Sequence, residues 1–462
     1  MKSIKIFIVV ILSIFASHLQ AQRILTLDES KQLALDNNTE AKNSRLETEA
    51  SRQKKKSAFT NFFPNISASG FMFRANENLM EINTQGGNLP VWDGKNFAQL
   101  MNPTQFAYMP ASTMGLLKKG TIGFINVMQP IFAGGRIYNG NRLALLGEDV
   151  SRYKEKMTGD EVLLKTEEQY RMIVSLDEKA KTVDKYEALL RRLLNQVEDG
   201  YNNGLVMKND VLKVKLKLGE VLLGKSKLEN GKKLATMAFC NHIGIPYDST
   251  LVLNNELNIT GSPEIYYMDN REALKNRTEY SLLEKSVEAE DLLTQMKLGE
   301  YLPQAGIGLS GTYMKFDGDK GRTLGMVVGT LSVPISNWWG GAHELQERKI
   351  KEEIAENNFK DKSELLILQM EKCRQDLTDA YKQYLLSLDS ETQAEENLKV
   401  NEDSYKNGLI NVSELLEAQA LYQQTQDQLT DAKTNYVVKK TRYLQSVLHN
   451  SGRNRGGLFF LA

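Results

Sequence analysis

Several residue types are scarce in this chain of 462 residues, and each scarcity excludes a class of function. The two cysteines, Cys240 and Cys373, are too few for a disulfide framework, and each lies in a helical pattern that explains it as a small buried residue. Basic and acidic residues number 58 each, so no net charge favours a nucleic-acid partner. The four histidines lack the spacing of a metal site: His18, His242, His343 and His449.

Catalytic and cofactor motifs are scarce as well. No grouping of serine, histidine and acid suggests catalysis, so we predict that the protein is not an enzyme and has no cofactor. Gly306, Gly308 and Gly311 have the spacing of a dinucleotide-binding loop, but a strand and turn follow them where that loop needs a helix. The sequence DGDKG from Asp317 lacks the third acidic ligand and final glutamate of a calcium loop, which favours a turn between strands.

The N-terminus has the order of a secretory signal peptide. Lys2 and Lys5 precede an apolar run, residues 6–16, and small or polar residues then lead to a cleavage site after Ala21. We expect a signal peptide of residues 1–21 and no lipid attachment, because no cysteine follows the cleavage site. No later apolar run reaches about 18 residues, so the sequence predicts no membrane-spanning helix.

Two halves of the chain repeat each other. The stretch YNNGLVMKND, residues 201–210, returns as YKNGLINVSE, residues 405–414, at an offset of 204. An offset of 239 aligns the earlier parts of the halves, as in Ala34 with Ala273, Leu35 with Leu274, and Pro64 with Pro303. The sequence therefore predicts two structural repeats, 22–250 and 251–450, and a C-terminal tail, 451–462.

Each repeat is predicted to contain a helix, a pair of strands and a helical hairpin. The expected ranges are helices 27–61 and 270–300, strands at about 65–76, 119–132, 304–316 and 324–335, and hairpins 136–242 and 343–449. In the third strand Ile307, Leu309 and Tyr313 alternate with small residues, a period of two that suits one face toward lipid and one toward a lumen.

Prolines and glycines indicate where these strands end. Pro130 and Pro334, each followed by a glycine pair (Gly134-Gly135 and Gly340-Gly341), are predicted to end strands before helices begin. The extra sequence of the first repeat, around 76–118, is predicted to form a long loop between strands. Four strands cannot close a membrane barrel, so several chains must combine their strands.

The hairpins show a coiled-coil pattern. Steps of four and three residues connect the apolar positions of the second hairpin: Leu366, Met370, Cys373, Leu377, Ala380 and Tyr384. At the repeated turn, Gly204 and Gly408 can adopt the left-handed conformation that ends a helix. We therefore predict that the duplicated turn forms the tips of two long hairpins.

These features together resemble the outer-membrane efflux protein family of the TolC type. The matching motifs are LTLDESKQLALDNN after the signal peptide, the two tyrosine-x-x-glycine-leucine turns, and LLEAQA in the second half. The resemblance implies an α+β membrane protein, a homotrimer in which each chain gives four strands to a 12-stranded β-barrel. That barrel would contact lipid of the cell outer membrane and continue into the periplasm as an α-helical barrel of coiled-coil hairpins.

The resemblance also implies a function. The family forms the passive outer-membrane channel of tripartite efflux or type I secretion systems, and an inner-membrane transporter supplies the substrates and the energy. A periplasmic adaptor protein would contact the hairpin tips: Gly204, Leu205, Val206, Gly408, Leu409 and Ile410. A different class shares the export signal and a coiled-coil hairpin, the periplasmic adaptor or scaffold proteins, although those frame one hairpin with soluble β-domains.

The resemblance further implies a gate at the tips. In the family, a tyrosine at the position of Tyr405 bonds to an acid at the position of Asp210, and such a charged hydrogen bond contributes about 1.5–3 kcal/mol. Well-studied members add an arginine where this chain has Ile410, so the arginine link is not expected here.

Two acids beside the second turn have two interpretations. Glu414 and Glu417 lie on one helical face, and three copies would form an acidic ring at the aperture that favours cations. The alternative is an ordinary solvated helix face. Lys213 stands in the first repeat where Glu417 stands in the second, so only the second repeat could supply both acids.

Overall fold

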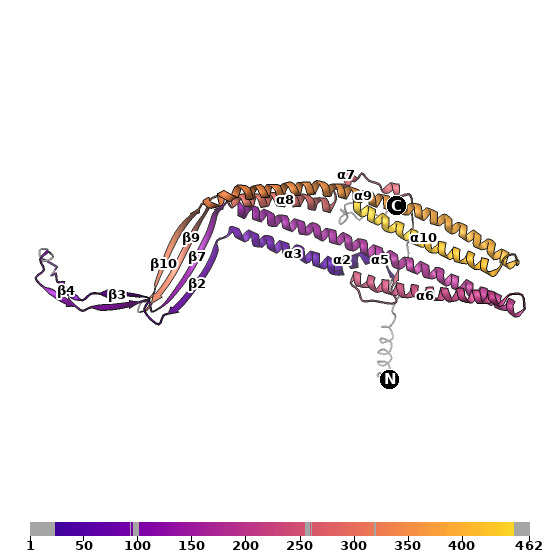
Figure 1. Ribbon diagram of the computed structural model, residues 1–462, viewed down its shortest axis with the longest axis horizontal. Helices are drawn as coiled ribbons and strands as arrows, with labels where there is room; N and C mark the ends of the chain where they lie inside the picture. The colour runs from indigo at the N-terminus through magenta and orange to yellow at the C-terminus, as the bar shows by residue number, and fades with distance from the viewer. Residues whose placement is uncertain are drawn as a thin grey trace, which may run out of the picture. The chain divides into compact units, whose positions relative to one another are not determined.

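The computed structural model describes residues 24–92, 94–95, 101–254, 259, 261–317 and 320–447. The predicted signal peptide and C-terminal tail lie outside these ranges. The chain divides into two compact units (Figure 1). Unit 1 comprises residues 1–52, 146–288 and 353–462, and unit 2 comprises residues 53–145 and 289–352. Each unit therefore draws on both halves of the sequence.

Unit 1 is mainly helical. Its elements are the short paired strands β1 (Ile24–Leu25) and β8 (Val252–Leu253) and the helices α2 (Leu27–Asn37), α6 (Lys208–Ile243), η3 (Pro263–Tyr266), α7 (Asn270–Leu274) and α10 (Val412–Val447). Four helices belong to both units: α3 (Thr39–Phe59), α5 (Arg136–Asn202), α8 (Thr278–Gly299) and α9 (Trp338–Lys406). Figure 1 shows α6 folding back along α5 and α10 along α9. No helix among the described residues combines the length and apolarity needed to cross a membrane.

The hairpin cores bury the predicted apolar positions. Met370 and Leu377 of α9 are fully buried in one cluster with Tyr436 and Tyr443 of α10. Cys373 joins the same cluster, and both cysteines are free and buried, as their apolar surroundings predict. The alternating four- and three-residue steps therefore identify the buried side of α9.

The first helix of each repeat is broken, which corrects the predicted continuous helices 27–61 and 270–300. Asn38 leaves helical geometry with ψ of 135°, and its Oδ1 accepts from the backbone N–H of Glu40 at 2.8 Å, so it starts α3. The second helix breaks at the matching place, between α7 and α8, where Arg277 lies 239 residues after Asn38. At the first break, the Asn38 side chain caps the backbone in place of a helical hydrogen bond.

His242 fills the junction between the end of α6 and the start of α3, which we call the first joint. The Asn38 amide lies 3.2 Å from His242 Nδ1 and donates to the His242 carbonyl at 2.9 Å. The Thr166 hydroxyl of α5 lies 3.1 Å from His242 Nε2. Burial lowers the pKa of His242; the Val162 carbonyl beside the ring raises it, the charge of Lys165 lowers it, and the charge of Glu40 raises it, with a net lowering. Folding therefore disfavours the protonated form of this imidazole.

His242 should make the protein less stable in mild acid. An unfolded histidine becomes protonated near pH 6.5, whereas the folded chain resists protonation, so the unfolded state binds more protons below about pH 6.5 and stability falls there. We expect the melting temperature of the purified protein to fall by about 2 °C or more between about pH 7.5 and 5.5. A His242→Asn variant should lose less over the same interval. An identical decrease in both proteins would contradict this role of His242.

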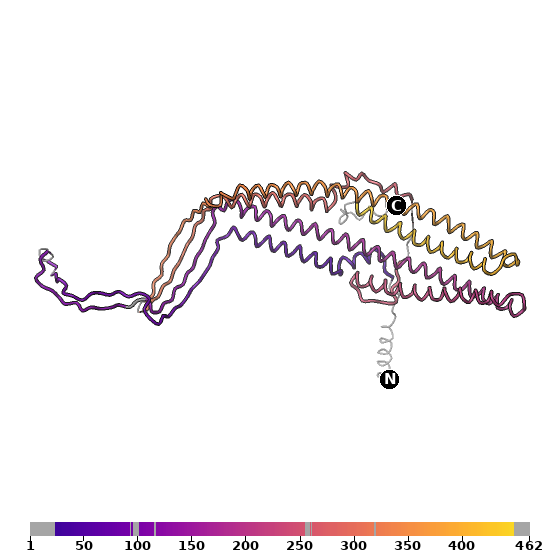
Figure 2. Tube along the Cα trace, in the orientation of Figure 1, coloured from indigo at the N-terminus to yellow at the C-terminus, as the bar shows by residue number. Residues whose placement is uncertain are grey.

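Unit 2 contains a four-stranded antiparallel sheet. Its strands are β2 (Asn65–Arg74), β7 (Lys119–Ala133), β9 (Gln304–Phe316) and β10 (Arg322–Ser332), in the order β10-β9-β7-β2. Figure 2 follows these four strands side by side. They lie within a few residues of the ranges predicted from alternation and turn residues. The outer strands β2 and β10 each have one edge without a partner in this sheet.

One row of side chains across this sheet is apolar on all four strands. Ile66, Val127, Leu309 and Val327 oppose one another across all four strands and form an apolar row, in which Ile66 is 70% and Val327 69% exposed. The next row, on the other face, contains Ser67, Asn126, Ser310 and Met326, and the Ser310 hydroxyl donates to Asn126 Oδ1 at 2.7 Å. Ile66, Leu309 and Val327 of this row are exposed, and Val127 is half-buried.

The predicted role of Pro130 and one predicted helix start need correction. β7 continues past Pro130 to Ala133, with a bulge between Pro130 and Phe132. The proline is tolerated because β2 pairs no further than Met128, so no ladder bond is lost on that side. In the second repeat, α9 begins at Trp338, so the pair Gly340-Gly341 lies inside the helix.

Gly341 lies inside α9, where it leaves space for a neighbouring side chain and does not form a turn. A Cβ atom there would lie 2.7 Å from the ring of Tyr301, and the Tyr301 carbonyl accepts from the Trp338 indole at 2.8 Å. Gly134 and Gly135, by contrast, adopt φ of 63° and 75° just before α5, as a turn requires. The two glycine pairs therefore serve different purposes.

The predicted loop at 76–118 is a β-ribbon over much of its described length. β3 (Met80–Thr84) pairs with β6 (Ser112–Leu116), and β4 (Gly87–Pro90) pairs with β5 (Phe106–Met109). In register, Ile82 opposes Met114 while Asn83 opposes Thr113, so apolar and polar pairs alternate. This alternation corrects the expectation of an irregular loop.

Candidate functional site: the paired hairpin tips

The two repeated turns have the same backbone geometry. Gly204 and Gly408 adopt φ of 69° and 70°. Leu205 N donates to Gly200 O at 2.8 Å, and Leu409 N donates to Ser404 O at 2.9 Å. Each glycine N–H also bonds to the carbonyl three residues earlier, that of Tyr201 or Tyr405 at 3.0 Å. Both helices thus end in the same glycine-dependent Schellman motif.

The returning helices start differently. Asn411 starts α10, because its Oδ1 accepts from Ser413 N at 2.8 Å and from Glu414 N at 3.2 Å. The Asn411 amide in turn donates to Glu414 Oε1 at 2.7 Å. The start of α6 has no side-chain cap at Met207. Glu414 therefore helps to begin its own helix, a role that the sequence analysis missed although Asn three residues before Glu is a known capping pattern.

A shared apolar core lies beneath the tips. It contains Leu190 and Val197 of α5, Val214 of α6, and Leu398 and Leu415 from the second hairpin. This cluster joins all four helices, so the core holds the two tips together. The second residue after each turn glycine, Val206 or Ile410, packs against the cluster, whereas Leu205 and Leu409 are 83% and 76% exposed. The exposed pair is free to contact a partner.

Tyr405 and Asp210 lie near each other in this region. Tyr405 packs against the shared core, and burial, followed by the negative charge of Asp210, raises its pKa. Among the described residues, no hydrogen bond links the two side chains. Asp210 Oδ1 instead lies 3.6 Å from Lys213 Nζ, which donates to the Ser413 hydroxyl at 2.7 Å.

Lys213 is the functional candidate that the sequence analysis undervalued. It connects Asp210 of the first hairpin to Ser413 of the second. Its spacing of three residues from Asp210 signals an ion pair on one helix face. The contact with Ser413 has no local signal, because it depends on the two hairpins lying side by side.

The two predicted aperture acids are exposed. Glu414 contacts Asn411, whereas Glu417 makes no ion pair or hydrogen bond within the described part of the chain. Both carboxylates point away from the buried side of α10, where Leu415 and Leu416 lie. No group of three or more histidine, cysteine or acidic residues able to hold a metal ion occurs in the described ranges.

Polar contacts join the two hairpins along their length. Lys179 of α5 pairs with Asp431 of α10 at 2.6 Å, and the exposed pair of Glu168 and Arg442 repeats this arrangement nearer the other end of α10. Gln445 donates to the Asp160 carbonyl at 2.6 Å. Exposed pairs of this kind are individually weak, so the apolar core beneath the tips contributes more to holding the hairpins together.

Comparison with solved structures identifies this architecture. The outer membrane protein VceC from Vibrio cholerae matches 91% of this chain and 95% of its own, with a TM-score of 0.71 and 12% identity. The Campylobacter jejuni CmeC outer membrane channel matches 91% of this chain and 85% of its own, with a TM-score of 0.72 and 13% identity. The chain has the fold of these outer-membrane channels.

The channel fold is conserved despite the low identity. The Neisseria gonorrhoeae MtrE outer membrane channel, solved in its open state, covers 91% of this chain and 88% of its own, with a TM-score of 0.67 and 13% identity. No family model matches the sequence, and no curated protein matches it. The resemblance inferred from the repeated turns is thus confirmed at the level of fold, over nearly the whole described chain.

Proposed function

We propose that this chain forms a passive outer-membrane channel of a tripartite efflux or type I secretion system. The observation that carries this proposal is the channel fold, which matches outer-membrane channels over 91% of the chain. Substrates would arrive from an inner-membrane transporter through a periplasmic adaptor protein. The exposed Leu205 and Leu409 at the tips provide an apolar contact for such an adaptor.

A homotrimer would complete the membrane-spanning part. The sheet has two free edges and a largely exposed apolar row, Ile66, Val127, Leu309 and Val327. Joining the β2 edge of one copy to the β10 edge of the next would satisfy both edges, and three copies would give about twelve strands. The apolar row would then face outer-membrane lipid and the row with Asn126 and Ser310 a lumen. The helical hairpins would extend into the periplasm, and the division into two structural repeats would give the trimer a near-sixfold arrangement.

The tips would close this channel at rest. Tyr405 and Asp210 form the proposed gate, with Lys213 as the side chain that ties Asp210 to the second hairpin. With Ile410 packed on the apolar core, no arginine link contributes. Glu414 and Glu417, repeated three times, would form an acidic ring that favours cations at the aperture.

Planar-bilayer conductance tests the channel and its gate. We expect small discrete steps from the detergent-purified protein and larger or longer openings from a Tyr405→Phe, Asp210→Ala variant. Lys213→Ala should act in the same direction. Loss of one charged interaction is expected to change the ratio of closed to open tips by about tenfold.

Lys217→Ala provides the matched control. Lys217 pairs with Glu220 at 3.1 Å, one helical turn beyond Lys213 and within α6 alone, so its loss should leave conductance unchanged. Equal steps from wild type and all gate variants would support the channel and exclude the gate. Absence of steps, combined with release of the protein from membranes by alkaline washing, would exclude the channel and favour a periplasmic scaffold.

A further inference from the structure

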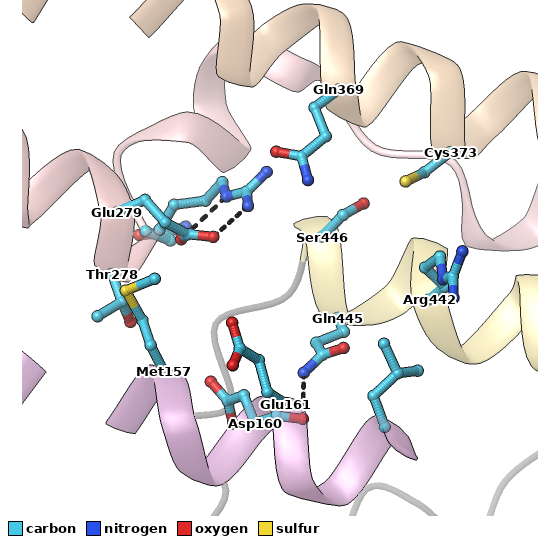
Figure 3. A pocket seen from close by; sticks show the side chains of 13 residues that line it. Met157, Asp160, Glu161, Thr278, Glu279, Gln369, Cys373, Arg442, Gln445 and Ser446 are labelled. Atoms are coloured by element: carbon cyan, nitrogen blue, oxygen red, sulfur yellow. Dashed lines mark hydrogen bonds and ion pairs between the residues drawn. The ribbon is translucent and has the colours of Figure 1, made fainter. Parts of the chain in front are cut away.

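A cavity of about 320 Å³ lies in unit 1 at the junction between the end of α10 and the start of α8, which we call the second joint. Residues of α5 close its opposite side (Figure 3). The lining combines apolar side chains, among them Met157, Leu164 and Cys373, with charged ones from both hairpins. A volume of this size falls at the small end of ligand pockets.

Arg277, which lines this cavity, has an unsatisfied donor. Its side chain is only 9% exposed, and its Nε and Nη2 both bond to the Glu279 carboxylate. The remaining nitrogen, Nη1, is buried and has no hydrogen-bond partner among the described residues. A buried guanidinium donor without an acceptor is unfavourable, and native proteins seldom leave one unexplained.

Comparison of the two joints shows how the cavity arises. At the offsets that align the repeats, Ser446 stands at the place of His242, and Arg277 stands at the place of Asn38. In the first joint the imidazole fills the space and contacts both Asn38 and Thr166. In the second joint the small Ser446 hydroxyl donates to a carbonyl of its own helix, at 2.7 Å. The second joint therefore has no imidazole ring at Ser446, and it has the cationic donor Arg277 in place of Asn38.

The opposite wall carries negative charge. Figure 3 shows the carboxylates of Asp160 and Glu161 directed into the space across from Gln369 and Ser446. Glu161 makes no ion pair or hydrogen bond within the described ranges. The lining thus includes a cation with an unpaired donor, an unpaired carboxylate and apolar side chains.

We propose that this cavity binds a small zwitterion, an α-amino acid with an apolar side chain. The ligand carboxylate accepts from Arg277 Nη1, and its ammonium group donates to Glu161. Its side chain contacts Met157 and Leu164. A molecule with both charges satisfies both unpaired groups, whereas an anion alone would face Asp160, Glu161 and Glu279, and the second lining cation, Arg442, is already paired with Glu168. The bound ligand would connect α5 of the first hairpin to α8 of the second.

A matched set of three probes tests the charge requirement. Saturation-transfer NMR on the full-length, detergent-purified protein would compare L-leucine with N-acetyl-L-leucine, which lacks the ammonium group, and L-leucinamide, which lacks the carboxylate. We expect L-leucine to bind with a dissociation constant of about 1 mM and each analogue at least about tenfold more weakly. Equal binding of all three probes, or no binding of L-leucine at about 10 mM, would overturn the proposal.

Substitutions locate the binding. Ser446→His should fill the second joint as His242 fills the first and abolish binding, while Ser446→Ala should retain it. Glu161→Gln, at an exposed position that does not threaten folding, should weaken L-leucine about tenfold and leave N-acetyl-L-leucine unchanged. Unchanged L-leucine binding in both Ser446→His and Glu161→Gln would place any binding elsewhere and refute this site. None of these measurements depends on channel activity.

Discussion

A Gly134→Ala variant is expected to lose about 3 kcal/mol or more of folding stability. Gly134 joins β7 to α5 with φ of 63°, a conformation that costs an alanine energy even in open space. Space is absent as well, because an added Cβ atom would lie 2.1 Å from the backbone oxygen of Gly299 at the end of α8. Neither backbone segment can move without shifting a strand or a helix.

Gly147→Ala is the control for this substitution. Gly147 lies within α5, and a Cβ atom there meets open space. Alanine should stabilise that helix by up to about 1 kcal/mol. Thermal melting and the yield of folded protein from membranes would measure both variants. A Gly134→Ala protein that melts together with wild type would show that the β7–α5 connection tolerates a side chain.

Local chemistry made part of this fold predictable. Gly204 and Gly408 end their helices because a residue in the left-handed conformation is needed there. The motif around them occurs twice in the sequence, which makes both turns recognisable. The steps that connect Met370 and Leu377 identify a buried helix side for the same reason. Such features depend on residues close in sequence, so a single sequence is sufficient to find them.

Features that depend on distant residues were missed. The break at Asn38 follows a charged helical sequence without glycine or proline, and its side chain is fixed by His242, which is 204 positions away. Pro130 looks like a strand end, yet its tolerance depends on where the neighbouring strand stops. Gly341 lacks a side chain because Tyr301 occupies the space.

The candidate site also has some features that the sequence predicts and others that depend on the packing of distant segments. The tip residues follow from the turn motif, and burial, followed by the negative charge of Asp210, raises the pKa of Tyr405. The link from Lys213 to Ser413 was not predicted, because it arises only when the two hairpins pack together. The second joint was also unexpected, since its cavity reflects the absence of a ring at Ser446 and becomes visible only beside His242.

A Glu167→Ala variant is expected to lose about 3 kcal/mol of stability. Glu167 of α5 has a side chain that is 6% exposed and connects three helices of unit 1. Lys31 of α2 lies 2.5 Å from its Oε2, and the Thr441 hydroxyl of α10 donates to its Oε1 at 2.9 Å. Removing the carboxylate leaves a partly buried ammonium group and a hydroxyl without their acceptor, and the cost arises mainly from these unpaired groups.

The adjacent residue supplies a stringent comparison. Glu168 also bridges α5 and α10, through Arg442 at 2.5 Å, but the side chains of this pair are 34% and 44% exposed. Because water and salt screen an exposed pair, Glu168→Ala should cost about 1 kcal/mol or less. Denaturant unfolding of both variants in the same buffer, with and without added salt, would separate them. If the two substitutions cost the same, burial would not explain the contribution of Glu167, and the contact among α2, α5 and α10 would have to depend on apolar packing alone.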